Sequence, residues 1–263
     1  MGIETAISWC HHTFNVAWGC TKVSPACTNC YAEAWAKRAG HEVWGPQQPR
    51  RTFGEKHWSE PLKWNAAAQK AGERRRVFCS SMADVFEDHP TIAEERLKLW
   101  PLIEATPWLD WLLLTKRPEN FNSFAPEHWR KGWPTNAWPM TTAENQHFAN
   151  IRIPELLKVP ASVHGVSMEP LLEPVDLRQI PYRNTYVLDS LKGDVRGTIT
   201  RDIYHIGSNV SWVIVGGESG PNARPPLWKA ERPIVGSREF LCLRPLPIHR
   251  EAYGHRQARG GVR

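Results

Sequence analysis

The chain has 263 residues and carries 33 Lys and Arg against 27 Asp and Glu, a formal net charge of +6 at pH 7. Its length allows one α/β-sized domain with a buried core, and it contains no apolar run of about 18 residues that would span a membrane. The N-terminus lacks the basic start and apolar core of a signal peptide, so we expect a cytoplasmic protein whose six cysteines are reduced or bound to metal.

The positive charge is concentrated at the C-terminus. Residues 223–263 hold nine Lys and Arg against three Asp and Glu, whereas residues 1–222 hold 24 basic and 24 acidic residues. The net charge therefore gives little support for broad phosphate binding by the body of the chain. We predict a domain over residues 1–225, followed by a basic, poorly ordered tail over residues 226–263 in which Cys242 is incidental.

Short apolar runs recur along the chain, and polar, helix-compatible stretches lie between them. The runs are near-continuous rather than alternating, which is typical of strands buried on both faces of a sheet. The alternation with helices favours a parallel sheet, open or curled, and six strands would make a partial (β/α)6 barrel. The predicted strands are a weak first run at Ala6–Trp9, then Arg76–Cys79, Trp108–Thr115, Ala137–Thr142, Ser162–Met168 and Ser211–Val215.

Helices are predicted between these strands at Tyr31–Arg38, Glu60–Ala71, Thr91–Ala105 and Asn145–Leu157. Ser59 is placed to cap the second helix, and Thr91 with Glu94 forms a capping-box pattern for the third. Pro101 should kink or split the third helix, because proline lacks the backbone N–H that a helix interior needs.

Polar residues follow the predicted strands at the point where each strand ends. The carboxyl ends of parallel strands meet at one edge of a sheet, so this succession predicts a shared ligand pocket. Each residue alone is equally consistent with an ion pair or a helix cap. The residues are Asp84 after the second strand, Lys116 and Arg117 after the third, Glu144 after the fourth, Glu169 after the fifth and Gly216-Gly217-Glu218 after the last.

The residue types in this predicted pocket suit particular ligand groups. Lys116 and Arg117 are suited to a carboxylate or a phosphate, and Asp84 and Glu169 to ribose hydroxyls or an amine. The paired glycines let a ligand approach the backbone, and Glu218 offers an acceptor. No Gly-Lys-Ser/Thr follows the glycines, which excludes a Walker-type phosphate loop.

Three cysteines, Cys20, Cys27 and Cys30, lie between the first predicted strand and the first predicted helix. A Cys-x-x-Cys pair lets two sulfurs face one metal centre, and a turn at Ser24-Pro25 can fold the third sulfur back. Clustered thiolates in a reducing compartment select zinc or an iron–sulfur cluster.

The number of cysteines bears on which metal is bound. A closed zinc site needs four ligands, and Cys10, His11 or His12 are the candidates for a fourth. Three thiolates suit a [4Fe–4S] cluster better, because the fourth iron is then left open to a substrate or cofactor. The start of a helix at Cys30 would also place backbone N–H groups near the cluster sulfurs.

Seven stretches from about Thr13 to Pro225 resemble, in order, a phage-associated three-cysteine-motif family of unknown function. They are TFNVAWGCTKVSPACTNCYAE, EPLKWN, VFCSSMADVFED, LLLTKRPEN, AENQHFANIRIPELL, SMEPLLEPVDL and WVIVGGESGPNARP. A three-cysteine loop before the first helix of a partial barrel also resembles the radical S-adenosylmethionine (radical SAM) superfamily. The tail after GPNARP departs from the family, whose members continue with a further helix and an apolar strand.

The resemblance to radical SAM enzymes implies a TIM-like partial barrel, a [4Fe–4S] cluster on Cys20, Cys27 and Cys30, and an electron donor. It implies reductive cleavage of S-adenosylmethionine to a 5′-deoxyadenosyl radical that abstracts hydrogen from a substrate. Gly216-Gly217-Glu218 resembles the superfamily's element for the methionine amino group, although here it follows the last predicted strand. The spacing is C-x6-C-x2-C where the superfamily usually has C-x3-C-x2-C, and Asn29 replaces an aromatic residue.

Other functions stay open from the sequence. A zinc-stabilised, non-catalytic module would bind nucleic acid or a partner through the Arg74-Arg75-Arg76 run and the tail. A barrel hydrolase would use Asp84, Glu169 and Glu218, but no Ser-His-Asp order or HExxH run supports it. For the iron–sulfur enzyme, nucleic acid or a nucleotide is the candidate substrate, and the sequence assigns no catalytic residue and no oligomeric state.

Overall fold

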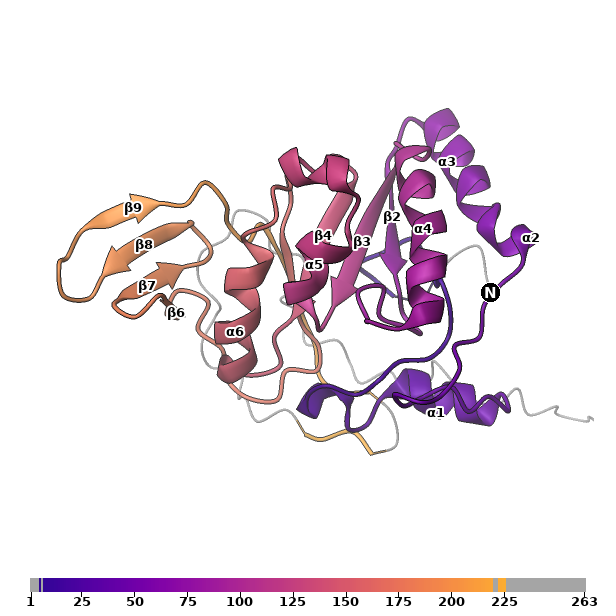
Figure 1. Ribbon diagram of the computed structural model, residues 1–263, viewed down its shortest axis with the longest axis horizontal. Helices are drawn as coiled ribbons and strands as arrows, with labels where there is room; N and C mark the ends of the chain where they lie inside the picture. The colour runs from indigo at the N-terminus through magenta and orange to yellow at the C-terminus, as the bar shows by residue number, and fades with distance from the viewer. Residues whose placement is uncertain (1–4, 6, 220–221, 226–263) are drawn as a thin grey trace, which may run out of the picture.

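A parallel sheet of six strands forms the centre of the molecule (Figure 1). The computed structural model describes residues 5, 7–219 and 222–225. The strands lie in the order β1-β2-β3-β4-β5-β10 and form a curled half-barrel, which confirms the predicted parallel, six-stranded arrangement. Their bounds are β1 (His12–Phe14), β2 (Arg75–Cys79), β3 (Leu109–Thr115), β4 (Ala137–Thr142), β5 (Gly165–Met168) and β10 (Trp212–Val215).

The first strand begins later than predicted. Ser8 and Trp9 form a turn, and β1 starts at His12, which pairs with Val77 of β2. The ring of Trp9 packs on Phe78 at a centroid distance of 4.8 Å. The prediction of a strand ending at Trp9 is therefore wrong, because Trp9 packs on the face of the sheet and β1 begins only at His12.

Helices on the face that carries Trp111 bury the main core. α3 contacts β2 and β3, and α6 contacts β4. Trp111 is fully buried there, with its ring edge-on to Phe14 at 5.6 Å and its Nε1 donating to Thr106 Oγ1 at 2.9 Å. The helices are α1 (Tyr31–Arg38), α2 (Glu55–Trp58), α3 (Glu60–Ala71), α4 (Pro90–Glu104), α5 (Phe121–Phe124) and α6 (Gln146–Leu156), with 3-10 turns η1 (Pro25–Cys27), η2 (Pro118–Asn120) and η3 (Glu127–Lys131).

The predicted helices are present, but two of their predicted end signals are wrong. α4 begins at Pro90, where proline needs no N–H partner, and the Thr91 capping box does not form. The helix runs unbroken through Pro101, which lies in its last turn, so the predicted split does not occur. Ser59 donates to Lys56 O at the end of α2 and does not cap α3 with its side chain.

The opposite face of the sheet, which we call the inner face, carries a smaller apolar cluster. Leu112, Met140, Trp212 and Ile214 form it, one or two from each of β3, β4 and β10. Successive side chains of a strand point to opposite faces, so Thr142 and Ser167 lie on this inner face at the carboxyl ends of β4 and β5.

A second, antiparallel sheet is inserted between β5 and β10 and lies beyond α6 in Figure 1. Its buried face brings Ile180, Leu188 and Val195 into the main core. This sheet was not predicted, because each strand has only three or four residues and the segment shows no long apolar run. The strands are β6 (Ile180–Tyr182), β7 (Tyr186–Asp189), β8 (Asp194–Gly197) and β9 (Ile203–His205).

Two other predictions concern membrane-spanning helices and the C-terminal tail. No helix within the described residues is long and apolar enough to cross a membrane. The predicted tail over residues 226–263, with Cys242, lies outside the described residues.

Candidate functional site

The three-cysteine loop connects β1 to α1, as predicted. Cys27 ends η1, and Cys30 occupies the N-cap position of α1. The loop starts at Gly19, whose φ of 118° is strained for any side chain and whose N–H donates to Met82 O at 3.0 Å. A Cβ on Gly19 would also collide with Val43 O, so only glycine lets the loop leave the sheet in this direction.

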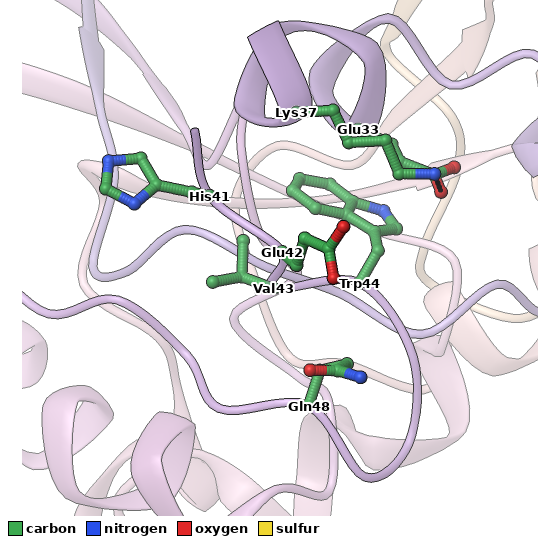
Figure 2. Close-up of a pocket in the computed structure, with 7 residues that line it drawn as sticks. All are labelled: Glu33, Lys37, His41, Glu42, Val43, Trp44 and Gln48. Atoms are coloured by element: carbon green, nitrogen blue, oxygen red, sulfur yellow. Dashed lines mark ion pairs between the residues drawn. The ribbon is translucent and has the colours of Figure 1, made fainter. Parts of the chain in front are cut away.

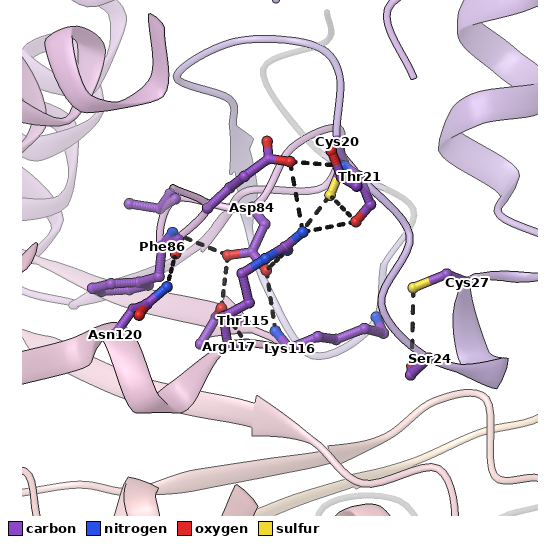
Figure 3. A network of polar contacts seen from close by, with 12 residues as sticks. Cys20, Thr21, Ser24, Cys27, Asp84, Phe86, Thr115, Lys116, Arg117 and Asn120 are labelled. Atoms are coloured by element: carbon purple, nitrogen blue, oxygen red, sulfur yellow. Dashed lines mark hydrogen bonds and ion pairs between the residues drawn. The ribbon is translucent and has the colours of Figure 1, made fainter. Parts of the chain in front are cut away.

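Hydrogen-bonding groups surround the first two cysteine sulfurs. Arg117 Nη1 lies 3.8 Å from Cys20 Sγ, within reach of an N–H···S hydrogen bond. Ser24 Oγ lies 3.9 Å from Cys27 Sγ and can donate to it when the cysteine is a thiolate. Figure 3 shows Cys20 facing Arg117 and Cys27 facing Ser24.

The third sulfur sits at the start of α1. Burial raises the pKa of the Cys30 thiol, and the backbone N–H groups of Glu33 and Ala32 oppose that shift. The positive charge of Lys116 acts in the same direction as these N–H groups. The three sulfurs therefore have different donors: a guanidinium, a hydroxyl and the open end of a helix.

The three thiols are not gathered into a ready metal site. Within the described residues, no group of three or more His, Cys, Asp or Glu side chains is arranged to hold a metal ion. Burial raises the pKa of the Cys20 thiol to about 12, with the negative charge of Asp84 adding to that shift. A metal that binds here must displace protons from buried thiols.

Arg117 and Asp84 lie together at the edge of the sheet, but they bind each other (Figure 3). Arg117 Nη1 is 2.8 Å from Asp84 Oδ2, and both side chains are buried. Asp84 Oδ1 also accepts from Thr115 Oγ1 at 2.7 Å and from Phe86 N at 3.0 Å. The structure therefore gives Asp84 and Arg117 a structural ion pair and leaves neither free for the predicted contacts with ribose or a carboxylate.

The side chain of Lys116, unlike that of Arg117, does not bind Asp84. Its backbone N–H donates to Asp84 Oδ2 at 3.2 Å, and Figure 3 shows its side chain extending away toward the segment of Ser24 and Cys27. Among the described residues, no hydrogen bond or ion pair engages its ammonium group. Lys116 is therefore the cation at this edge that is available to an anionic ligand.

Glu218 is committed to the three-cysteine loop. Its Oε2 accepts from Asn29 Nδ2 at 2.9 Å and from Arg224 Nε at 2.9 Å, and its Oε1 pairs with Arg224 Nη2 at 2.6 Å. Arg224 Nη2 also donates to Pro25 O at 2.9 Å. Burial alone would raise the pKa of Glu218. The hydrogen bonds from Arg224 and Asn29 outweigh burial and lower this pKa to about 2. The carboxylate thus fastens the loop to the chain after β10.

Gly216 and Glu169 meet on the inner face. A Cβ at Gly216 would collide with the Glu169 carboxylate, so the glycine makes room for it, whereas Gly217 has open space around it. Burial raises the pKa of Glu169, and a hydrogen bond from Trp9 opposes that shift. The two residues therefore lie side by side after the carboxyl ends of β5 and β10.

Three buried polar side chains lie at the ends of β4 and β5: Glu144, which was part of the predicted pocket, and Thr142 and Ser167, which were missed. Thr142 Oγ1, Ser167 Oγ and Glu144 Oε1 are buried and have no hydrogen-bond partner, and Thr142 pairs with Ser167 across the two strands. Glu144 Oε2 is 2.7 Å from Arg152 Nη1, and burial lowers the pKa of Arg152 although the carboxylate of Glu144 opposes that shift. The only sequence signal was the position of Glu144 directly after a buried strand.

The candidates for a fourth zinc ligand lie elsewhere. Cys10 is buried beside Phe78, with Arg76 and Glu169 as its charged neighbours. His11 Nδ1 accepts from Arg76 N at 2.9 Å, and the ring of His12 stacks on Trp64 at 4.4 Å. These three residues are grouped around β1 and β2 and do not turn toward the three-cysteine loop.

The arginine run does not form one basic patch. Arg74 pairs with Asp110, and Arg75 pairs with Glu73 at 3.1 Å. The guanidinium of Arg76 lies over the ring of Trp212 at 5.2 Å, on the inner face. The run therefore offers little free charge to a nucleic acid.

A recess of about 180 Å³ lies behind the loop, against α1 (Figure 2). Glu33 and Lys37 line one side of it, and Trp44 lines another. Glu33 is ion-paired with Lys37 at 2.8 Å and with Lys22 at 2.6 Å, so its charge is already neutralised. None of the residues that line this recess is a cysteine, so the recess is separate from the three thiols.

A family model described as "Protein of unknown function (DUF5131)" matches residues 4–232. No curated protein matches the chain. A solved structure of a mutant spore photoproduct lyase with bound AdoMet and dinucleoside spore photoproduct aligns at 14% identity with a TM-score of 0.44. The alignment covers 64% of this chain and 48% of that chain, so this chain spans about half the length of that structure.

Proposed function

The chain belongs to the DUF5131 family of proteins of unknown function, and we propose that it is an iron–sulfur enzyme that acts on S-adenosylmethionine. Cys20, Cys27 and Cys30 would hold a [4Fe–4S] cluster. When bound, such a cluster supplies the electron for reductive cleavage of S-adenosylmethionine. The observation that carries the proposal is that each of these three thiols has its own hydrogen-bond donor.

The donor set fits a cluster better than a structural zinc ion. A cluster with three thiolate ligands concentrates negative charge on its sulfurs, and the guanidinium, hydroxyl and helix N–H groups are placed to stabilise that charge. A closed zinc site needs a fourth ligand, and the candidates Cys10, His11 and His12 are engaged around β1 and β2.

The edge of the sheet beside the loop fits a polar cofactor. Thr142 Oγ1, Ser167 Oγ and Glu144 Oε1 are buried without partners, and buried polar atoms in native proteins normally have them. Hydroxyl and amino groups of S-adenosylmethionine would satisfy these acceptors, and its carboxylate would suit the free ammonium of Lys116.

The test is anaerobic purification with iron and sulfide reconstitution, followed by metal and sulfide analysis and an absorption spectrum. A brown protein with about four irons per chain supports the proposal. A colourless protein with one zinc and no sulfide overturns it in favour of a zinc-stabilised module. Addition of S-adenosylmethionine and dithionite to the loaded protein should then yield 5′-deoxyadenosine, and its absence would contradict the enzymatic part.

Matched cysteine variants identify the ligands. Replacing Cys20, Cys27 or Cys30 by Ala should each abolish iron retention, because each variant removes one of the three proposed thiolate ligands. Cys79→Ala is the control, since Cys79 is fully buried in β2 with Ser80 Oγ as its neighbour at 3.4 Å. Loss of iron in this control as well would indicate general misfolding.

A further inference from the structure

A cation lies beside the sulfur of Cys20 and is held rigidly there. Arg117 Nη1 is 3.8 Å from Cys20 Sγ, and Nη2 of the same guanidinium donates to the carbonyl oxygen of Thr21 at 2.7 Å. The guanidinium therefore contacts both Cys20 and the residue after it. Arg117 is only 8% exposed, so water does little to screen its charge.

Carboxylates fix the orientation of this guanidinium. Asp84 Oδ2 lies 2.8 Å from Arg117 Nη1, and Glu87 Oε1 lies 3.6 Å from Nη2. Asp84 is itself held by the hydroxyl of Thr115 at 2.7 Å. Arg117 consequently cannot swing away from Cys20 without leaving the buried carboxylate of Asp84 without a counter-ion, which is costly.

A second arginine anchors the other side of the loop. Arg50 binds both oxygens of Glu87 at 3.0 Å each, and Glu87 Oε1 accepts from the backbone N–H of Thr21 at 2.8 Å. Neither Arg50 contact reaches the Cys20 sulfur. The network thus separates two tasks: Arg50 and Glu87 hold the backbone, whereas Arg117 touches the sulfur.

We propose that Arg117 is a positioning residue that raises the reduction potential of the cluster through its hydrogen bond and charge at Cys20, with Asp84 opposing it. This inference rests on the proposed function, because it requires the cluster. One-electron reduction adds a negative charge to a cluster. A fixed positive charge and an N–H···S bond favour the reduced state, and a fixed negative charge disfavours it.

Two substitutions that each remove one charge should then shift the midpoint potential in opposite directions. Arg117→Gln removes the cation and should shift the midpoint potential to more negative values. Asp84→Asn removes the counter-charge while keeping a side chain of the same shape, and should shift the potential to more positive values. A residue that merely stiffens the loop would not give shifts of opposite sign. Arg117→Lys keeps the charge but loses the planar fork, so it should restore much of the potential lost in Arg117→Gln.

The experiment is a dithionite titration of each reconstituted, cluster-loaded chain, followed by electron paramagnetic resonance. Iron content and circular dichroism establish that each variant is folded and loaded. Opposite shifts, with partial rescue by Arg117→Lys, support the inference. Equal potentials, or shifts in the same direction, in loaded variants overturn it while the proposed function stands. A wild-type chain that takes up no cluster overturns both. If Arg117→Gln does not fold, the sign of the Asp84→Asn shift decides, and a shift to more negative values overturns the inference.

Discussion

Asn29 and Glu218 lie 189 positions apart in the sequence and are joined by a hydrogen bond of 2.9 Å. Asn29 stands between two of the three cysteines, and Glu218 follows the last strand of the parallel sheet. The contact therefore joins the loop between β1 and α1 to the segment that follows β10. Arg224 strengthens it by binding both oxygens of Glu218.

Arg224→Ala should loosen the three-cysteine loop, because it removes the ion pair with Glu218 and the hydrogen bond to Pro25 O. A partly exposed pair of this kind contributes about 1 kcal/mol, so amide hydrogen exchange over residues 24–30 should rise about fivefold. Arg130→Ala is the control, since it breaks an exposed pair with Glu127 in η3. Equal exchange in the two variants would contradict a role for Arg224 in the loop.

Lys116→Met should weaken the binding of S-adenosylmethionine about tenfold, since a charge-assisted hydrogen bond contributes about 1.5 kcal/mol or more. Iron content should stay unchanged, because Lys116 is not a cysteine donor. Equilibrium dialysis with the loaded protein measures the affinity. Lys70→Met, at an exposed position in α3, should leave it unaltered. Unchanged affinity in Lys116→Met would remove this residue from the ligand site.

Acid should destabilise the folded chain through two histidines, the half-buried His57 and the buried His164. Burial lowers the pKa of His57 and His164, whose Nε2–H groups donate at 2.8 Å to Asn15 O and Val159 O, respectively. The unfolded chain takes up these protons near pH 6.5, before the folded chain does. Stability is therefore complete above pH 6.5 and falls below it, by at most about 1.4 kcal/mol per pH unit for each histidine.

Urea unfolding at a series of pH values from 7.5 to 5.5 measures this effect. His164→Gln should flatten the dependence by about one proton, because it removes one of the two groups. A free energy of unfolding that stays constant between pH 6.5 and 5.5 would show that these histidines are protonated as readily in the folded chain as in the unfolded one.

Trp111→Ala should lower the free energy of unfolding by about 3–5 kcal/mol. The ring is fully buried between the sheet and its helices, and its removal leaves a cavity beside Phe14. Leu97→Ala, at a side chain that is 72% exposed on α4, should change the stability by less than about 0.5 kcal/mol. A similar cost for both variants in urea unfolding would place the core elsewhere.

The parallel sheet could be predicted from the sequence because its strands are long enough to show an apolar run. The run LDWLLLT of β3 is nearly all buried, and the predicted Ala137–Thr142 matches β4 at both ends. The antiparallel sheet could not be predicted in the same way. Its strands carry only a few inward residues, such as Leu188 and Val195, and become stable by pairing with one another.

The positions of the candidate residues after the strands could be predicted from the sequence, but not which of these residues pair with one another. The residues after each strand do gather at one edge, yet the sequence does not say that Asp84 faces Arg117 or that Glu218 faces Arg224. Such pairs depend on side-chain direction and on contacts across long sequence separations. Lys116 and Arg117 are neighbours of the same charge, and only their three-dimensional surroundings distinguish the committed cation from the free one.

The antiparallel insertion also affects how the protein is made. β5 ends at Met168, and its partner β10 begins only at Trp212. At ribosomal rates of about 5–20 residues per second, the hydrogen-bonding edge of β5 stays uncovered for several seconds while the insertion is synthesised. An open, apolar strand edge is a template for pairing with other chains. Early folding of β6–β9 against α6 would place a folded unit beside that edge before β10 arrives.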